Sequence, residues 1–184
     1  GDVKQALNLL MAPDIKHSAQ SWHDEVETIK NMPDSHLTMD MSRLNPQAVI
    51  EAVRKRTADD HVVATDVGQH QMWTAQYYHF GNPRTFVTSG GLGTMGFGMG
   101  AAIGACVGTG KRTVLFTSDG SFHMNMNELA TTVTNNLPLI IVLMDNNALG
   151  MVRQWQTMFY DNRYSQTTLS RQTDYAKLAE AFGG

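Results

Sequence analysis

The chain has 184 residues, of which 42% are hydrophobic, and its 14 Lys and Arg against 17 Asp and Glu give a formal net charge of −3. This length and apolar content suffice for one substantial core but not for two large domains. Scattered basic residues argue against nucleic acid as a partner, and no uncharged apolar run approaches the roughly 18 residues of a membrane span.

Cys106 is the only cysteine, so an intramolecular disulfide and a cysteine-based zinc site are excluded. A reducing, cytoplasmic setting fits this composition, and no N-terminal signal segment is visible. The chain starts at Gly1 instead of Met, and it stops at Gly184 just after a helical pattern begins. We interpret both ends as cut points of a longer protein.

The first 44 residues are predicted to be the end of a preceding domain and a linker. Val3, Leu7 and Leu10 have helical spacing, whereas residues 13–42 contain scattered polar, His and Met residues with little β-pattern. Asn45 and Pro46 then indicate a helix start, as N-cap and first helical residue. We therefore expect the main domain to span residues 45–184, with its C-terminus truncated.

Short apolar runs alternate with helical segments in this main domain. The predicted strands are 61–65, 85–88, 113–117 and 139–144, and the predicted helices are 69–80, 125–136 and 149–155. Nearly continuous apolar strands that alternate with helices indicate a parallel sheet covered on both faces. The predicted fold class is α/β, with an open, mostly parallel sheet and helices on both faces.

A glycine-rich segment, residues 90–108, lies between the second and third predicted strands. Glycines recur every four residues at 96, 100, 104 and 108, which places them near one another on a helix. This spacing also suits a membrane helix dimer, but Lys111 and Arg112 end the run too early for a span. We therefore expect these glycines to let a soluble helix pack closely on its sheet.

Asp119 and Asn146 follow the third and fourth predicted strands, at the sheet edge where open α/β folds bind ligands. Carboxylate and amide oxygens are ligands that Mg²⁺ accepts, together with water and phosphate oxygens. Gly120 allows a sharp turn with exposed N–H groups, and Ser121 adds a hydroxyl group. Either element alone is more often structural, but the pair predicts a Mg²⁺ site that holds a diphosphate.

Ser118-Asp119-Gly120, followed by Asp145-Asn146, resembles the thiamine diphosphate signature, which begins Gly-Asp-Gly and ends in Asn. Three further blocks extend the resemblance: Gly-Gln-His-Gln-Met-Trp at 68–73, the segment 88–98, and Leu-Gly-Met-Val-Arg-Gln-Trp at 149–155. In this combination the chain resembles the C-terminal thiamine diphosphate-binding domain of acetohydroxyacid synthase (acetolactate synthase) catalytic subunits.

The resemblance implies that Asp119 and Asn146 bind Mg²⁺ through their side chains and Ala148 through its backbone carbonyl. Met95 would keep the cofactor bent, and Trp155 would help to select the second 2-oxoacid substrate. The other cofactor-binding residues would be Gly68, Gln69, His70, Gly93, Gly120, Ser121, Leu149, Gly150, Met151 and Val152. Outside the motif context, ordinary structural roles would be the favoured interpretation of His70, Met95 and Trp155.

The family reaction joins pyruvate to a second 2-oxoacid, either pyruvate or 2-oxobutyrate, in branched-chain amino acid biosynthesis. The activating glutamate comes from the N-terminal domain of a partner subunit, so this chain is expected to carry no catalytic residue and to be inactive alone. FAD is expected in the full-length enzyme but not on this chain. The expected assembly is a homo-oligomer, dimer or tetramer, with a regulatory subunit as a further potential partner.

Several departures and alternatives remain open. Ser118, Asp145 and Ala148 differ from the residues common in the family, and Asp145 adds a negative charge near the metal. Another thiamine diphosphate decarboxylase or carboligase would share the metal motif. Residues 91–96 also fit G-x-G-x-x-G, with Asp119 at the distance of a ribose-binding acid, so an NAD-binding Rossmann unit is a rival hypothesis. A purely structural, dimerising module without cofactor affinity is another.

Overall fold

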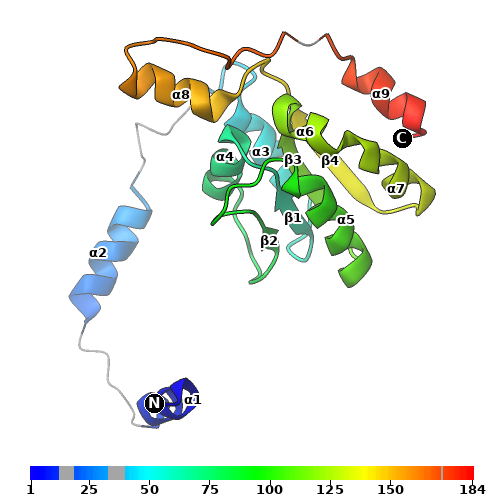
Figure 1. Ribbon diagram of the computed structural model, residues 1–184. Coiled ribbons are helices and arrows are strands. Elements are labelled where there is room, and N and C mark those ends of the chain that lie inside the picture. Colours follow the sequence, from blue (N-terminus) through cyan, green and yellow to red (C-terminus); the bar gives the residue numbers. More distant parts are fainter. Residues whose placement is uncertain (13–18, 33–39, 171) are drawn as a thin grey trace. The chain divides into compact units, whose positions relative to one another are not determined.

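The computed structural model describes residues 1–12, 19–32, 40–170 and 172–184 (Figure 1). The chain divides into two compact units, residues 1–39 and 40–184. The second unit thus begins slightly before the predicted start at Asn45. Much of the predicted linker, 13–18 and 33–39, lies outside the described residues.

The first unit contains two helices, α1 (Val3–Met11) and α2 (Gln20–Lys30). α1 starts where the Asp2 side chain accepts the backbone N–H groups of Lys4 and Gln5. α2 lies inside the predicted linker and was not expected, although Trp22, Val26 and Ile29 have helical spacing. The described side chains of both helices are exposed.

The second unit is built on a sheet of four parallel strands in the order β2-β1-β3-β4 (Figure 1). The strands are β1 (Val62–Thr65), β2 (Phe86–Val87), β3 (Thr113–Ser118) and β4 (Leu139–Met144). The predicted α/β fold class and all four predicted strand positions are confirmed. β3 lies between β1 and β4, and its residues from Thr113 to Thr117 are buried.

Helices pack on both faces of this sheet. α3 (Pro46–Arg54) and α4 (Gln69–Tyr77) pack on one face, where Ile50 and Tyr78 meet Val63, Val114 and Phe116. The opposite face is covered by α5 (Phe97–Thr109), α6 (Asp119–Asn125), α7 (Leu129–Thr134) and α9 (Tyr175–Phe182). Successive strand residues point to opposite faces, so each face has its own apolar core.

α3 begins as predicted, because the Asn45 side chain accepts the N–H of Ala48 and Pro46 is the first helical residue. The structure differs from the single helix predicted at 125–136. α6 already starts at Asp119, and a 3-10 turn (Met126–Glu128) separates it from α7. An acidic residue in the first turn of a helix is favourable, so the Asp-Gly-Ser sequence starts a helix instead of forming a separate turn.

The glycine-rich segment forms α5, but most of its glycines do not contact the sheet. A Cβ atom at Gly98 would lie 2.8 Å from the Asp66 backbone nitrogen, whereas Cβ atoms at Gly100, Gly104 and Gly108 would meet nothing within 4 Å. The expected close packing on the sheet is therefore wrong for Gly100, Gly104 and Gly108, and the close approach is made by Gly98, which lies outside the four-residue repeat. Gly96 has a separate role, because its φ of +86° forms the turn that leads into α5.

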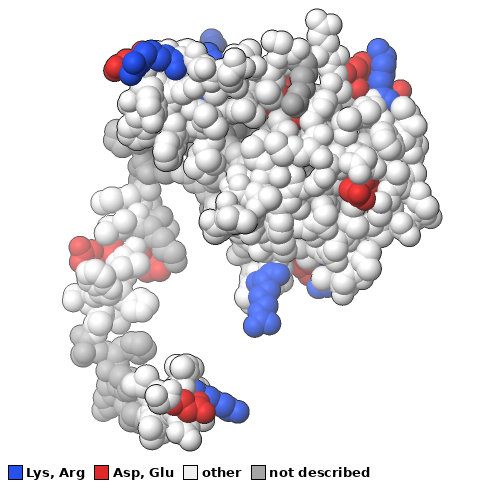
Figure 2. Space-filling model, in the orientation of Figure 1, with Lys and Arg blue, Asp and Glu red and all other residues white. Residues whose placement is uncertain are grey.

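The surface of the second unit carries few charged groups over α5, which has no charged residue (Figure 2). Among the described residues, Lys and Arg form no continuous band on the face that Figure 2 shows. In the described part of the chain, no helix is long and apolar enough to cross a bilayer.

Candidate cofactor-binding site

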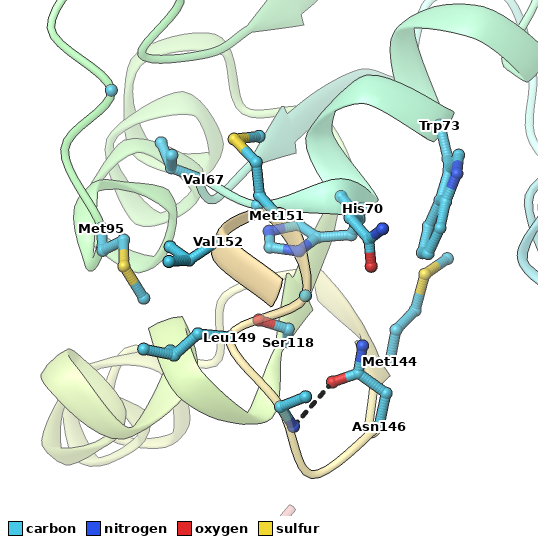
Figure 3. A pocket seen from close by; sticks show the side chains of 15 residues that line it. Val67, His70, Trp73, Met95, Ser118, Met144, Asn146, Leu149, Met151 and Val152 are labelled. Carbon is cyan, nitrogen blue, oxygen red and sulfur yellow. Dashed lines mark hydrogen bonds between the residues drawn. The ribbon is translucent and has the colours of Figure 1, made fainter. Parts of the chain in front are cut away.

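A cavity of about 240 Å³ lies at the carboxyl edge of the parallel sheet (Figure 3). Its walls come from the segments that follow β1, β3 and β4 and from the turn before α5. The lining residues are Val67, Gly68, Gln69, His70, Trp73, Gly93, Met95, Ser118, Met144, Asn146, Ala148, Leu149, Gly150, Met151 and Val152. This edge is where open parallel sheets bind ligands.

The cavity brings together most of the residues that were expected to bind a cofactor, from blocks far apart in the sequence. Asp119, Gly120 and Ser121 do not line it and are buried in the first turn of α6. Trp155 lies on α8 (Gly150–Phe159) and lines a separate hollow, which shares only Val152 with the main cavity.

His70 is buried at the start of α4 and faces the cavity (Figure 3). Within the described structure its Nε2 atom has no hydrogen-bond partner. Burial disfavours the charged imidazole and lowers the pKa of His70 to about 4. The side chain is therefore neutral near pH 7, with one buried ring nitrogen available to a ligand.

Gly68 and Gly150 allow close packing in the cavity wall that contains Gln69 and His70. A Cβ at Gly68 would lie 2.8 Å from the His70 ring, and one at Gly150 would overlap the Gln69 side-chain oxygen. The Gln69 amide donates to Gln154 Oε1 at 3.0 Å, which connects the start of α4 to α8. These close approaches place the Gly68–His70 segment against the first turn of α8.

Asp66 is a site residue that the sequence analysis missed. Its side chain is 1% exposed at the end of β1. One carboxylate oxygen accepts the N–H groups of Val67 and Gly96, both at 2.8 Å, and the other accepts that of Gly98 at 3.2 Å. Burial raises the pKa of Asp66, and these three N–H groups oppose that rise. The sequence signal that could have identified Asp66 is an acidic residue directly after an apolar strand.

This arrangement argues against the NAD-binding hypothesis. A Rossmann unit binds a pyrophosphate at the N-terminus of the helix that follows its glycine-rich turn. Here the corresponding helix is α5, and the N–H groups of Gly96 and Gly98 already donate to the carboxylate of Asp66. A second anion at this position would meet a buried negative side chain.

The predicted metal ligands lie at the same sheet edge. Ser118 pairs with Met144 in the β3–β4 register, so Asp119 and Asn146 follow directly from neighbouring strand ends. The Asn146 side-chain oxygen accepts the N–H of Ala148 at 3.1 Å, in a turn where Asn147 has a φ of +53°. Within the described residues no group of three or more His, Cys, Asp or Glu could hold a metal.

Residues 167–169 cover this edge from outside. The Thr167 carbonyl accepts the N–H of Leu149 at 2.9 Å, and the Asn147 carbonyl accepts that of Leu169 at 2.8 Å. A Cβ at Gly120 would lie 3.0 Å from the Leu149 side chain and 3.3 Å from that of Leu169. The β4–α8 turn and the first turn of α6 are therefore packed together, which positions the metal-ligand candidates.

Comparison with known proteins identifies the family. The model of the family described as "Thiamine pyrophosphate enzyme, C-terminal TPP binding domain" matches residues 66–184, a range that begins at Asp66 and includes the whole cavity lining. The chain belongs to this family. Thiamine pyrophosphate is thiamine diphosphate, so the resemblance predicted from the sequence blocks is confirmed.

The relatives of this thiamine pyrophosphate-binding domain agree with one another. It is 40% identical to the acetolactate synthase isozyme 3 large subunit of Escherichia coli (strain K12) over 191 residues, which covers 100% of this chain and 33% of the relative. The isozyme 2 large subunit of that organism is 54% identical over 136 residues, 73% of this chain and 25% of the relative. The acetolactate synthase large subunit of Lactococcus lactis subsp. lactis (strain IL1403) is 40% identical over 186 residues, which covers 99% of this chain and 32% of the relative. The chain thus spans about a third of such relatives.

Proposed function

We propose that this domain binds the diphosphate half of thiamine diphosphate, with Mg²⁺, as part of an acetolactate synthase that joins pyruvate to a second 2-oxoacid. The observation that carries the proposal is the cavity at the carboxyl edge of the sheet, where sequence blocks of the family meet. The reaction is taken from the relatives, which are acetolactate synthase large subunits. The reducing cytoplasm suits the single free thiol.

The side chains present fit such a cofactor. The Gln69 amide can donate to phosphate oxygens. Buried His70 Nε2 would donate to them once the ring proton moves from Nδ1, which bonds the Asp66 backbone, to Nε2. Met95, Leu149 and Val152 form an apolar surface on the other side of the cavity (Figure 3). An apolar cavity with a few polar groups at one end suits a ligand that has a charged tail and an aromatic body.

A Mg²⁺ ion would be held by the Asp119 carboxylate, the Asn146 amide oxygen and the Ala148 carbonyl. Because the described residues contain no group of three or more His, Cys, Asp or Glu that could hold a metal, water and diphosphate oxygens would complete its coordination. The Asn146 oxygen would exchange its hydrogen bond from Ala148 for the ion. Gly120 and Ser121 would support the diphosphate through the first turn of α6.

The cofactor, when bound, supplies the reactive carbon that takes up the first 2-oxoacid, and the protein supplies orientation and electrostatics. His70 and Gln69 would orient the diphosphate, whereas Met95 and Val152 would orient the rings and exclude water. Trp155, 59% exposed on α8, would contact the second 2-oxoacid, pyruvate or 2-oxobutyrate. The words "large subunit" in the relatives' names support a smaller partner subunit. A regulatory role for that partner and a homo-oligomer of this chain are part of the proposal.

Calorimetric titration of thiamine diphosphate into the folded chain, with and without Mg²⁺, tests the proposal. We expect Mg²⁺-dependent binding that Asp119→Ala abolishes. Asp161→Asn is the control, because that side chain is 93% exposed, does not line the cavity and has a positive φ that asparagine tolerates. The proposal is wrong if the folded chain binds no cofactor at millimolar concentration and still binds none after the remaining domains of the Escherichia coli isozyme 3 large subunit are supplied.

A further inference from the structure

One buried carboxylate connects two walls of the cavity. Asp66 does not line the cavity, yet it accepts the N–H of Val67 on one wall and that of Gly96 next to Met95 on another. Val67 is held from its other side as well, because its carbonyl accepts the Ser121 hydroxyl at 2.8 Å. Figure 3 shows that these two walls adjoin on one side of the cavity, where Val67 and Met95 lie.

The contact with Gly96 acts directly on Met95. The Gly96 N–H belongs to the peptide group that begins at the Met95 carbonyl carbon, so a hydrogen bond to this N–H fixes the backbone from which the Met95 side chain leaves. The Gly96 carbonyl accepts the Asn125 amide at 2.6 Å, and the φ of Gly96 is +86°. The turn is thus held on both sides in a conformation that glycine favours.

The charge of Asp66 matters as well as its shape. Hydrogen bonds from N–H groups to a carboxylate are stronger than those to a neutral oxygen, and the N-terminus of α5 favours a negative group. An amide of the same shape would turn its NH₂ group toward one of these N–H donors. At least one of the three hydrogen bonds would then be lost in a buried position.

We propose that Asp66 is a positioning residue that fixes Met95 against the cavity through the Met95–Gly96 peptide, without contact with the ligand. The consequence for cofactor binding rests on the proposed function above. The positioning itself is a property of the protein alone, and it is measurable without any cofactor.

Methyl NMR tests the positioning. The chain has 12 methionines, which are labelled with ¹³C at the methyl group, and Met95→Leu assigns the Met95 signal. In Asp66→Asn we expect this signal to move toward the averaged position of exposed methionines, while the signal of Met144, on β4 at the cavity, stays in place. Asp59→Asn is the matched control, because Asp59 pairs with Arg54 before β1 begins. An unchanged Met95 signal in Asp66→Asn would overturn the proposal.

A double-mutant cycle tests the effect on the cofactor. Asp66→Asn should weaken Mg²⁺-dependent thiamine diphosphate binding about tenfold, as is typical for residues that orient a binding group. In the Met95→Ala background the same substitution should change the affinity less than about twofold. An equal loss in both backgrounds would show that Asp66 acts through another residue and would overturn the proposal. If the wild type binds no cofactor, the proposed function fails, and the methyl spectrum alone decides about Asp66.

Amide exchange of the wild type covers the case in which Asp66→Asn does not fold. The first N–H groups of a helix lack partners within the helix and normally exchange quickly. We expect the Gly96 and Gly98 amides to exchange at least about tenfold more slowly than the exposed Leu92 amide, because both donate to buried Asp66. Rapid exchange at both glycines would overturn the proposal.

Discussion

Two ionisable side chains, His70 and Asp66, are buried within one strand-to-helix connection at the cavity edge. Burial disfavours the charged form of each, so it lowers the pKa of His70 and raises that of Asp66. They differ in their partners: three backbone N–H groups support the Asp66 carboxylate, whereas His70 Nε2 has no partner in the described structure. Asp66 is thus suited to a structural task and His70 to a ligand.

The lowered pKa of His70 predicts a loss of stability in acid. Well above pH 6.5 the imidazole is neutral in both the folded and the unfolded state and adds no pH dependence. Between pH 6.5 and about 4 the unfolded chain binds a proton that folded His70 does not, so the free energy of unfolding falls as pH falls. The total loss is about 3 kcal/mol, and it levels off below pH 4.

Denaturant unfolding of the wild type and of His70→Gln across pH 7 to 4 measures this term as the difference between the two proteins. His79→Gln, at an exposed position just after α4, is the control. Parallel pH profiles for the wild type and His70→Gln would contradict the prediction.

Sequence blocks predicted most of the cavity lining, because residues such as Gln69, His70 and Asn146 sit at fixed offsets from strand ends. The role of Asp66 was not predicted, because its partners Gly96 and Gly98 are 30 and 32 positions away in the sequence. No local sequence pattern indicates such a long-range contact. Trp155 illustrates a different limit. Its place on α8 followed from the sequence, but the separate hollow that it lines did not.

At the scale of elements, α5 has two chemically different sets of glycines. Gly104→Ala should raise the free energy of unfolding by about 0.5–1 kcal/mol, because alanine favours a helix and the added methyl meets nothing. Gly98→Ala should lower it by about 2–3 kcal/mol, because the methyl would press on the Asp66 backbone. Denaturant unfolding of the two variants side by side measures both. Equal effects would mean that both glycines face the same environment.

The strands were predictable because each is a short apolar run that needs a sheet to bury it, and β1, β3 and β4 appear at the predicted positions. The glycine spacing was predictable as a helical repeat, but spacing alone does not say which helix face meets the sheet. In α5 that face is formed by Gly98, Met99, Ala102 and Cys106. α6 starts at Asp119, earlier than the predicted helix at 125–136, because a helix N-terminus favours an acidic residue. The sequence analysis interpreted Asp-Gly-Ser as a turn and therefore missed this helix start.

At the scale of the whole molecule, the second unit should be stable without the first. Residues 40–184 contain both apolar cores, whereas the described side chains of α1 and α2 are exposed. A chain that starts at Asp40 should therefore unfold with a free energy within about 0.5 kcal/mol of the full chain. Thermal and denaturant unfolding of both chains measure this. A large loss would show that the N-terminal unit contributes to the fold of the second.

The single cysteine lies on the sheet-facing side of α5 and is 3% exposed. No other thiol in the chain competes with it for a reagent. A disulfide reagent added under native conditions can therefore modify Cys106 only when α5 moves away from the sheet. The rate of that modification, compared with the rate in denaturant, gives the free energy of this opening, so Cys106 is a built-in probe of local unfolding at α5.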